Sequence, residues 1–190
     1  MNFKRLEIPD IVVCDPNIMG DDRGYFAETY RQDKLNEFLR YSIHFCQDNE
    51  SRSSYGVLRG LHYQLPPYAQ TKLVRVIQGR VLDVAVDIRK GSPTFRQHVA
   101  VELSGENRKQ LLIPKGFAHG FLVLSEEALF AYKVDNFYYK EWERGMAYND
   151  PAIGIDWKLA ENKIAYSVKD SRLPLFKDIQ YFDYKMKFHA

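Results

Sequence analysis

The chain has 190 residues, enough for one domain with a substantial buried core, and no linker, repeat or low-complexity tract divides residues 1–190. Its 27 basic and 25 acidic residues are interspersed and leave a net charge of only +2, which gives no reason to expect a surface for nucleic acid or membrane. No apolar run is long enough to span a bilayer, so we expect neither kind of partner.

The first two predicted elements are a short helix and a strand. Residues 33–40, DKLNEFLR, have helical spacing, with leucine and phenylalanine on one face. Residues 55–64, YGVLRGLHYQ, are interpreted as a strand whose side chains alternate between two faces, which places Arg59 and His62 on opposite faces. Each face mixes apolar and polar side chains, as is typical of a strand that lines a wet cavity.

The following segments continue the strand pattern. Residues 71–89 predict a hairpin, because two β-branched runs flank Gly79, which supplies the positive φ of a tight turn. Many short strands separated by turns predict an all-β antiparallel sandwich or barrel with a few short helices. The remaining predicted elements are strands within 96–104, 111–125 (broken at residues 114–116) and 128–139, and a short helix within 160–168.

The two cysteines, Cys14 and Cys46, lie in apolar-leaning segments. We expect two buried free thiols rather than a disulfide, because disulfides are rare in reducing compartments. This pattern favours a cytoplasmic location.

Four polar clusters interrupt the strands and supply candidate site residues. A lone strand histidine is more often structural than catalytic, exposed lysines are usually solvated, and a strand tyrosine is usually core. The residues alone therefore indicate a β-domain with a pocket for an anionic ligand. The clusters hold Arg23 and Glu28, then Gln47, Asn49, Arg59 and His62, then His119, and finally Lys169 and Asp170.

These residue types suit proton transfer. Histidine is the commonest general base, and it works best when a carboxylate such as Asp83 or Asp170 holds its other ring nitrogen. A tyrosine can return a proton as a general acid, and Lys72 can stabilise an oxyanion. The planar guanidinium groups of Arg23 and Arg59 suit a diphosphate.

A metal-free site is the expectation. His62 has no H-x-H partner, so we favour a metal-free site over one built from His62, His119 and a carboxylate. No C-x-x-C, G-x-x-x-x-G-K or G-x-S-x-G pattern is present, so the sequence carries no signature of a cysteine or serine nucleophile.

Six segments, spread over residues 21–170, resemble blocks of the dTDP-4-dehydrorhamnose 3,5-epimerase family in the family's order. The resemblance implies a cupin-like jelly roll without metal or redox cofactor, acting on a dTDP-linked 4-keto-6-deoxyhexose in dTDP-L-rhamnose synthesis. The ketone acidifies the protons on C3 and C5, and both carbons are inverted. The segments are DDRGYFAE, VLRGLHYQ, QTKLVRVIQGRVLDVAVDIRKGSPTF, LLIPKGFAHGFLVLSE, YNDPAIGIDW and SVKD.

The resemblance also implies the roles of individual residues. His62 is the base with Asp170 as its partner, Tyr132 is the acid, and Lys72 stabilises the enolate oxygen. Tyr138 stacks on the thymine base. It further implies a homodimer in which residues 23–28 complete the neighbouring site. The implied substrate-binding positions are Arg23, Glu28, Gln47, Asn49, Arg59, Lys72, His119, Tyr138, Glu143 and Lys169.

Other functions remain open at this point. A relative could invert one carbon only, use a GDP-linked sugar, or be a ketoisomerase. A non-catalytic nucleotide-sugar binder needs no acid–base pair, so the joint presence of His62, Lys72, Tyr132 and Asp170 argues against it. A metal-dependent cupin oxygenase is disfavoured by the missing H-x-H.

Overall fold

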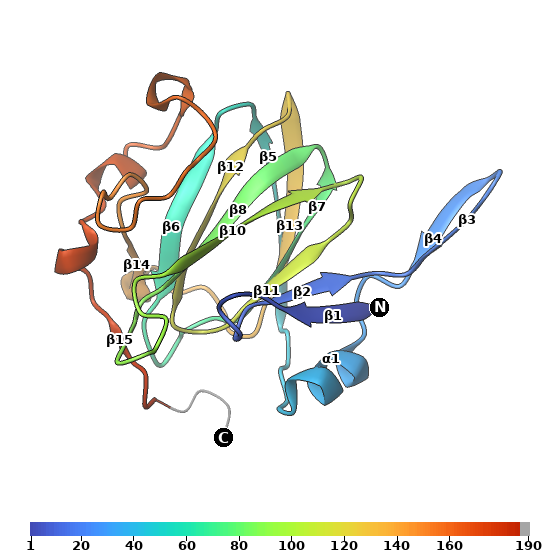
Figure 1. Ribbon diagram of the computed structural model, residues 1–190, viewed down its shortest axis with the longest axis horizontal. Helices are drawn as coiled ribbons and strands as arrows, with labels where there is room; N and C mark the ends of the chain where they lie inside the picture. The colour runs from blue at the N-terminus through green and yellow to red at the C-terminus, as the bar shows by residue number, and fades with distance from the viewer. Residues whose placement is uncertain (187–190) are drawn as a thin grey trace.

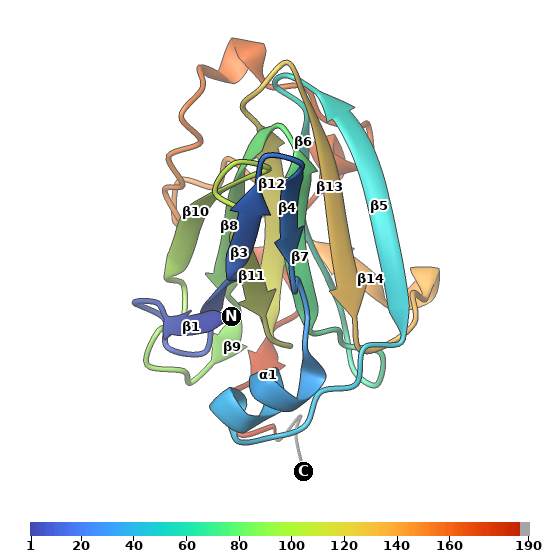
Figure 2. The same cartoon turned by 90° about the vertical axis from the view of Figure 1, so that its right-hand side faces the viewer.

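A computed structural model describes residues 1–186, so residues 187–190 of the predicted domain lie outside the described part (Figure 1). Two antiparallel sheets pack face to face and confirm the predicted β-sandwich (Figures 1 and 2). The six-stranded sheet has the order β1 (Asn2–Arg5), β2 (Val12–Asp15), β11 (Gln110–Ile113), β7 (Lys72–Gln78), β13 (Glu127–Val134), β5 (Gln47–Ser54). The five-stranded sheet has the order β10 (His98–Ser104), β8 (Arg80–Asp87), β12 (Phe117–Val123), β6 (Leu58–Gln64), β14 (Glu143–Gly145).

Smaller elements surround the sandwich. The hairpin of β3 (Ile18–Asp21) and β4 (Gly24–Ala27) projects away from it (Figure 1). The short parallel pair is β9 (Arg89–Lys90) and β15 (Phe182–Asp183). The predicted first helix is confirmed as α1 (Gln32–Leu39), whereas a single 3₁₀ turn, Glu161–Lys163, takes the place of the second. The other 3₁₀ turns are Lys140–Trp142, Asp170–Arg172 and Phe176–Asp178. None of the helices in residues 1–186 is long and apolar enough to cross a membrane.

The predicted hairpin over residues 71–89 is wrong, although its turn is present. Gly79 has a φ of 80°, as expected for a tight turn. However, β7 pairs with β11 and β13, whereas β8 pairs with β10 and β12. The chain therefore passes at Gly79 from one sheet to the other, and these two strands face each other across the sandwich.

Strand β8 is buried on both faces. Val81 and Ala85 pack between the two sheets, and Asp83 lies on the same face. Leu82 and Val84 on the opposite face pack against the C-terminal part of the chain, including Trp157 and Phe176. This C-terminal segment lies along the outer side of the five-stranded sheet, close to β6 and β14 (Figure 1). The apolar face of β8 that carries Leu82 and Val84 is therefore covered by the C-terminal segment and not by the six-stranded sheet.

A β-bulge between β6 and β12 changes the phase of the motif strand. His119 pairs with His62 and Phe121 pairs with Arg59, so two residues of β6 oppose the single Gly120 of β12. Arg59 and His62 consequently line the same cavity, which corrects their predicted placement on opposite faces. Gly60, with a φ of 132°, is one of the two residues that oppose Gly120.

One cysteine prediction is also wrong. Cys14 is buried in β2, and burial raises the pKa of its thiol to about 12. Cys46 is exposed, because it immediately precedes β5, which is the edge strand of its sheet.

Gly120→Ala tests the bulge. A Cβ at Gly120 would lie 2.6 Å from the Arg59 carbonyl oxygen and 3.0 Å from Gly60 Cα, both backbone atoms that cannot rotate away. We expect a loss of about 2 kcal/mol in the free energy of unfolding, as for an overpacked interior. Denaturant unfolding measures it, with Gly20→Ala as the control, because its nearest contact is 3.4 Å in an exposed hairpin. Equal stability of the two variants would contradict the steric role.

Candidate active site

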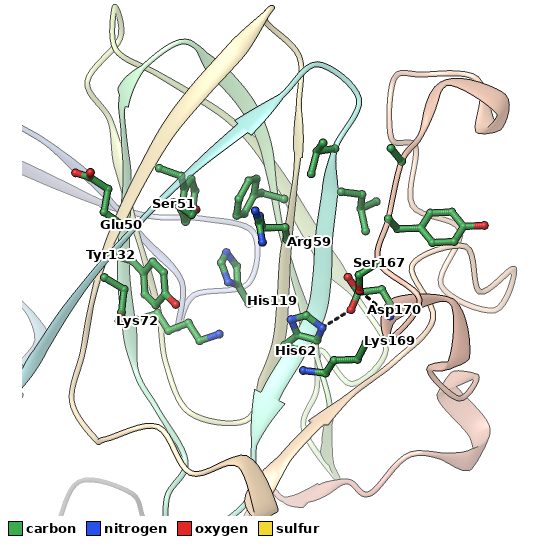
Figure 3. A pocket seen from close by; sticks show the side chains of 17 residues that line it. Glu50, Ser51, Arg59, His62, Lys72, His119, Tyr132, Ser167, Lys169 and Asp170 are labelled. Atoms are coloured by element: carbon green, nitrogen blue, oxygen red, sulfur yellow. Dashed lines mark hydrogen bonds and ion pairs between the residues drawn. The ribbon is translucent and has the colours of Figure 1, made fainter.

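A cavity of about 620 Å³ lies between the two sheets (Figure 3). Strands β5, β7 and β13 supply one wall, β6 and β12 supply the other, and residues 165–170 close one side. The sequence candidates that line it are Asn49, Arg59, His62, Lys72, His119, Tyr132, Lys169 and Asp170.

His62 and Asp170 form a hydrogen-bonded pair in one wall. His62 Nε2 lies 2.6 Å from Asp170 Oδ1, and the Asp170 side chain is only 5% exposed. Burial alone would raise the pKa of Asp170, but the hydrogen bond and charge of His62 outweigh it and lower this pKa. Asp170 therefore stays a carboxylate that accepts from Nε2, which leaves Nδ1 of His62 with a lone pair for a ligand.

Tyr132 lies across the cavity from His62 (Figure 3). It belongs to β13 of the six-stranded sheet, between Asn49 of β5 and Val74 of β7. Burial raises the pKa of its phenol, the charge of Glu143 adds to the effect, and Arg59 opposes it. Tyr132 is therefore protonated at neutral pH and able to donate a proton.

Lys72 projects from the start of β7 into the space between Tyr132 and His62 (Figure 3). Burial lowers the pKa of its ammonium group to about 8, against the opposing charges of Asp83 and Glu143. The group is mainly a cation at neutral pH. A cation at this place can hold an oxyanion that forms between a base and an acid.

His119 and Asp83 form a second, deeper pair. His119 Nε2 lies 3.0 Å from Asp83 Oδ2, and both side chains are buried. Burial lowers the pKa of His119, although the charge and hydrogen bond of Asp83 oppose this. Of the two carboxylates proposed as partners for His62, Asp170 takes that place and Asp83 holds His119 instead.

The carboxylate of Glu143 joins two other candidates, Tyr138 and Lys169. Glu143 Oε2 accepts from the Tyr138 hydroxyl at 2.8 Å and from Lys169 Nζ at 2.6 Å. Burial would raise the pKa of Glu143, but the hydrogen bonds from Lys169 and Tyr138 lower it. Tyr138 stays about half exposed, at 52%, so part of its side chain is accessible to a ligand.

The remaining polar candidates are held by neighbours. Gln47 Nε2 donates to Asn49 Oδ1 at 2.8 Å, and Arg59 Nε donates to Ser53 Oγ at 3.0 Å. These bonds fix the side chains of Asn49 and Arg59 in the wall of the cavity.

Two candidates lie away from this cavity. Arg23 is in the projecting hairpin, 90% exposed and paired with Asp21 at 2.5 Å. Glu28 pairs with Arg31 at 3.8 Å and Lys34 at 3.6 Å, and it borders a separate hollow of about 420 Å³ beside β5, β7 and β13. A single copy of the chain does not bring either residue to His62.

Sequence reasoning missed several lining residues. Phe121 and Phe130 stack at 4.0 Å and give the cavity an apolar part. Their only sequence signal is an aromatic residue in a strand, which equally describes core. Ser51, Tyr166 and Ser167 also line the cavity and have no distinctive spacing. Within residues 1–186, no group of three or more histidine, cysteine, aspartate or glutamate side chains is placed to hold a metal ion.

The lowered pKa of Lys72 is measurable. In protein labelled with ¹³C at lysine Cε, we expect one NMR resonance to titrate near pH 8, and the Lys72→Met spectrum to lack it. Because the folded pKa lies below the unfolded value of 10.5, Lys72 adds stability as pH rises from about 8 toward 10.5. Lys72→Met should remove this rise. A Lys72 resonance that titrates only above pH 10 would contradict the burial of a charged group here.

A family model and relatives of known name match most of the chain. The family model described as dTDP-4-dehydrorhamnose 3,5-epimerase matches residues 5–178. The chain is 53% identical to dTDP-4-dehydrorhamnose 3,5-epimerase of Shigella flexneri, over 96% of this chain and 99% of the relative. It is 50% identical to that of Pseudomonas aeruginosa, with the same two coverages.

A solved structure is similarly close. The dTDP-6-deoxy-D-glucose-3,5-epimerase of Legionella pneumophila, in complex with dTDP-4-keto-L-rhamnose, superposes with a TM-score of 0.93 at 48% identity. The match covers 97% of this chain and 99% of that one, which confirms the predicted cupin-like sandwich. The chain therefore belongs to the dTDP-4-dehydrorhamnose 3,5-epimerase family of isomerases.

Proposed function

We propose that this protein inverts C3 and C5 of dTDP-4-dehydro-6-deoxy-D-glucose and so produces dTDP-4-dehydro-L-rhamnose. The observation that supports the proposal is that two side chains suited to act as base and acid line one cavity from opposite sheets. His62, held by Asp170, faces Tyr132 across the cavity, with Lys72 between them (Figure 3). The Legionella relative, bound to dTDP-4-keto-L-rhamnose, supports the substrate class.

Each inversion needs one proton removed and one returned. Nδ1 of His62 takes the proton from the carbon beside the ketone, and the electron pair of that C–H bond moves into a C4 enolate. Lys72 holds the enolate oxygen by charge and hydrogen bond. The Tyr132 hydroxyl then gives its proton to the opposite face of the same carbon, and the electrons return from the oxygen to restore the ketone.

The two catalytic groups must then be reset. After one inversion His62 carries the extra proton as an imidazolium, and Tyr132 is a phenolate. Proton exchange with water restores both, since His62 and Tyr132 are each partly exposed. Asp170 favours the imidazolium while it exists and holds the ring in place.

The nucleotide and diphosphate are assigned to the surrounding polar residues. Arg59 and Lys169 supply positive charge for the diphosphate, and the half-exposed Tyr138 ring stacks on thymine. The other proposed substrate contacts are Gln47, Asn49, His119 and Glu143.

We further propose that the working unit is a homodimer. Arg23 and Glu28 resemble substrate-binding positions of the family, yet in one copy they lie outside the cavity that holds His62. The hairpin that carries Arg23 projects from the sandwich (Figure 1). Its side chains Met19, Tyr25 and Phe26 are exposed. A second copy would cover these side chains and receive Arg23 in its own site. A cytoplasmic location is part of the proposal, because both cysteines are free thiols.

Hydrogen–deuterium exchange tests the reaction. The 4-keto substrate is incubated with the protein in D₂O, and the exchange is followed by proton NMR. We expect deuterium to enter at both C3 and C5. His62→Ala and Asp170→Asn should slow exchange by about 10²- to 10⁴-fold, the usual contribution of general acid–base catalysis. Asp178→Asn is the control, because this exposed carboxylate also lies in a C-terminal 3₁₀ turn.

The outcomes separate the alternatives. Label at one carbon only would identify a single-carbon epimerase, and exchange with a GDP-linked sugar alone would reassign the nucleotide. Tight binding without any exchange would leave a nucleotide-sugar binder and refute the catalytic roles.

Complementation between variants tests the dimer. Arg23→Ala and His62→Ala should each be nearly inactive alone. When subunits exchange, half of the dimers combine one of each, and one of their two sites is intact. Activity should then recover to roughly a quarter of the unmodified level in an isologous pair. No recovery, in mixtures where mass spectrometry detects mixed dimers, would show that Arg23 does not serve the partner's site.

A further inference from the structure

Gln64 is a buried polar residue that the mechanism above does not use. It is the last residue of β6, two positions after His62, and is only 4% exposed. In the register of the sheet it lies opposite Glu143 of β14. A buried amide normally needs all of its hydrogen bonds, so its partners indicate what it holds in place.

The Gln64 side-chain amide forms hydrogen bonds to the backbone on both sides of Tyr138. Its Nε2 donates to the carbonyl oxygen of Phe137 at 3.1 Å, and its Oε1 accepts from the backbone N–H of Tyr139 at 2.6 Å. The second proton of Nε2 goes to the Tyr68 carbonyl oxygen at 2.7 Å. The two peptide groups that flank Tyr138 are therefore bonded to a single side chain.

Further contacts hold the segment around Tyr138 in place. The rings of Tyr68 and Tyr139 lie 3.9 Å apart, and the Leu65 N–H donates to the Trp142 carbonyl oxygen at 3.0 Å. The Tyr138 hydroxyl donates to Glu143, the residue opposite Gln64. Tyr138 is thus held at its backbone by Gln64 and at its hydroxyl by Glu143, while the ring stays half exposed.

We infer that Gln64 is a positioning residue that sets the place of the Tyr138 ring relative to His62. Both residues are tied to one strand, His62 as part of β6 and Tyr138 through the Gln64 amide. The inference rests on the proposed function, in which Tyr138 stacks on the base while His62 acts on the sugar. Gln64 thereby fixes the distance between the two protein groups that contact the base and the sugar of one nucleotide-sugar.

Only an amide satisfies this arrangement. A methionine has nearly the same shape but cannot bond to the two carbonyl groups or the N–H. An ionised glutamate keeps the bond from Tyr139 but places a carboxylate oxygen against two carbonyl oxygens. When protonated, it regains one donor, so a glutamate variant should improve as pH falls.

The test compares Gln64→Met, Gln64→Glu and Tyr138→Ala for dTDP affinity by calorimetry and for KM and kcat. We expect Gln64→Met to weaken dTDP binding and raise KM about tenfold, which is close to the affinity that one base–aromatic stack contributes. The kcat should stay within about twofold of the unmodified value. In the Tyr138→Ala background the same substitution should change affinity little, because the stack is already lost. Gln64→Glu should bind more weakly at pH 8 than at pH 5.

The exposed Gln78, at the far end of β7, provides the matched control as Gln78→Met, which should bind normally. Three outcomes would each overturn the inference. The first is that the losses of dTDP affinity add in the Gln64→Met, Tyr138→Ala double variant. The others are a fall in kcat as large as the rise in KM, and an unchanged dTDP affinity of Gln64→Met. If Gln64→Met does not fold, the pH dependence of Gln64→Glu decides. Normal dTDP binding by Tyr138→Ala would refute base stacking and the inference with it, whereas the exchange reaction tests epimerisation separately.

Discussion

The close contact between β6 and β12 determines the geometry of the site. At the bulge the carbonyl oxygens of Arg59 and His119 and the Cα atoms of the two glycines lie so close together that Gly60 and Gly120 have no room for a Cβ. The extra residue shifts the alternation of β6 by one position between Arg59 and His62. The guanidinium and the imidazole therefore enter one cavity, while Leu58 and Leu61 keep their places in the outer core.

The proposed mechanism uses both sheets of the sandwich, because it needs proton transfer on two faces of a sugar. His62 comes from one sheet and Tyr132 from the other, and the packing of the sheets sets the distance between them. Burial sets the charge states: it favours a neutral phenol at Tyr132 and lowers the pKa of Lys72, while the hydrogen bond from His62 keeps Asp170 ionised. The cavity is thus preorganised by elements that serve the core as much as the chemistry.

The sequence predicts local structure better than pairing. Period-two alternation and turn residues are enough to predict the all-β class and the turn at Gly79. They do not identify which strands pair, and the predicted hairpin over residues 71–89 is therefore wrong. The phase shift of β6 depends on Gly120, which is sixty positions away, and the exposure of Cys46 depends on β5 being an edge. The need of a histidine base for a carboxylate partner limits the candidates beside His62 to Asp83 and Asp170. Gln64 was missed, because its partners are backbone groups that carry no sequence signal.

The C-terminal segment has a consequence for biosynthesis. Every strand of both sheets precedes residue 146, whereas Asp170 arrives on the segment that packs outside the five-stranded sheet. Since a nascent chain emerges from its N-terminus, the strands that carry His62, Lys72 and Tyr132 leave the ribosome first. The histidine remains without its carboxylate until the last part of the chain has been translated and has docked. Under the proposed mechanism, an unfinished chain therefore has His62 without the carboxylate that orients it as a base, and it also lacks Lys169 of the proposed diphosphate site.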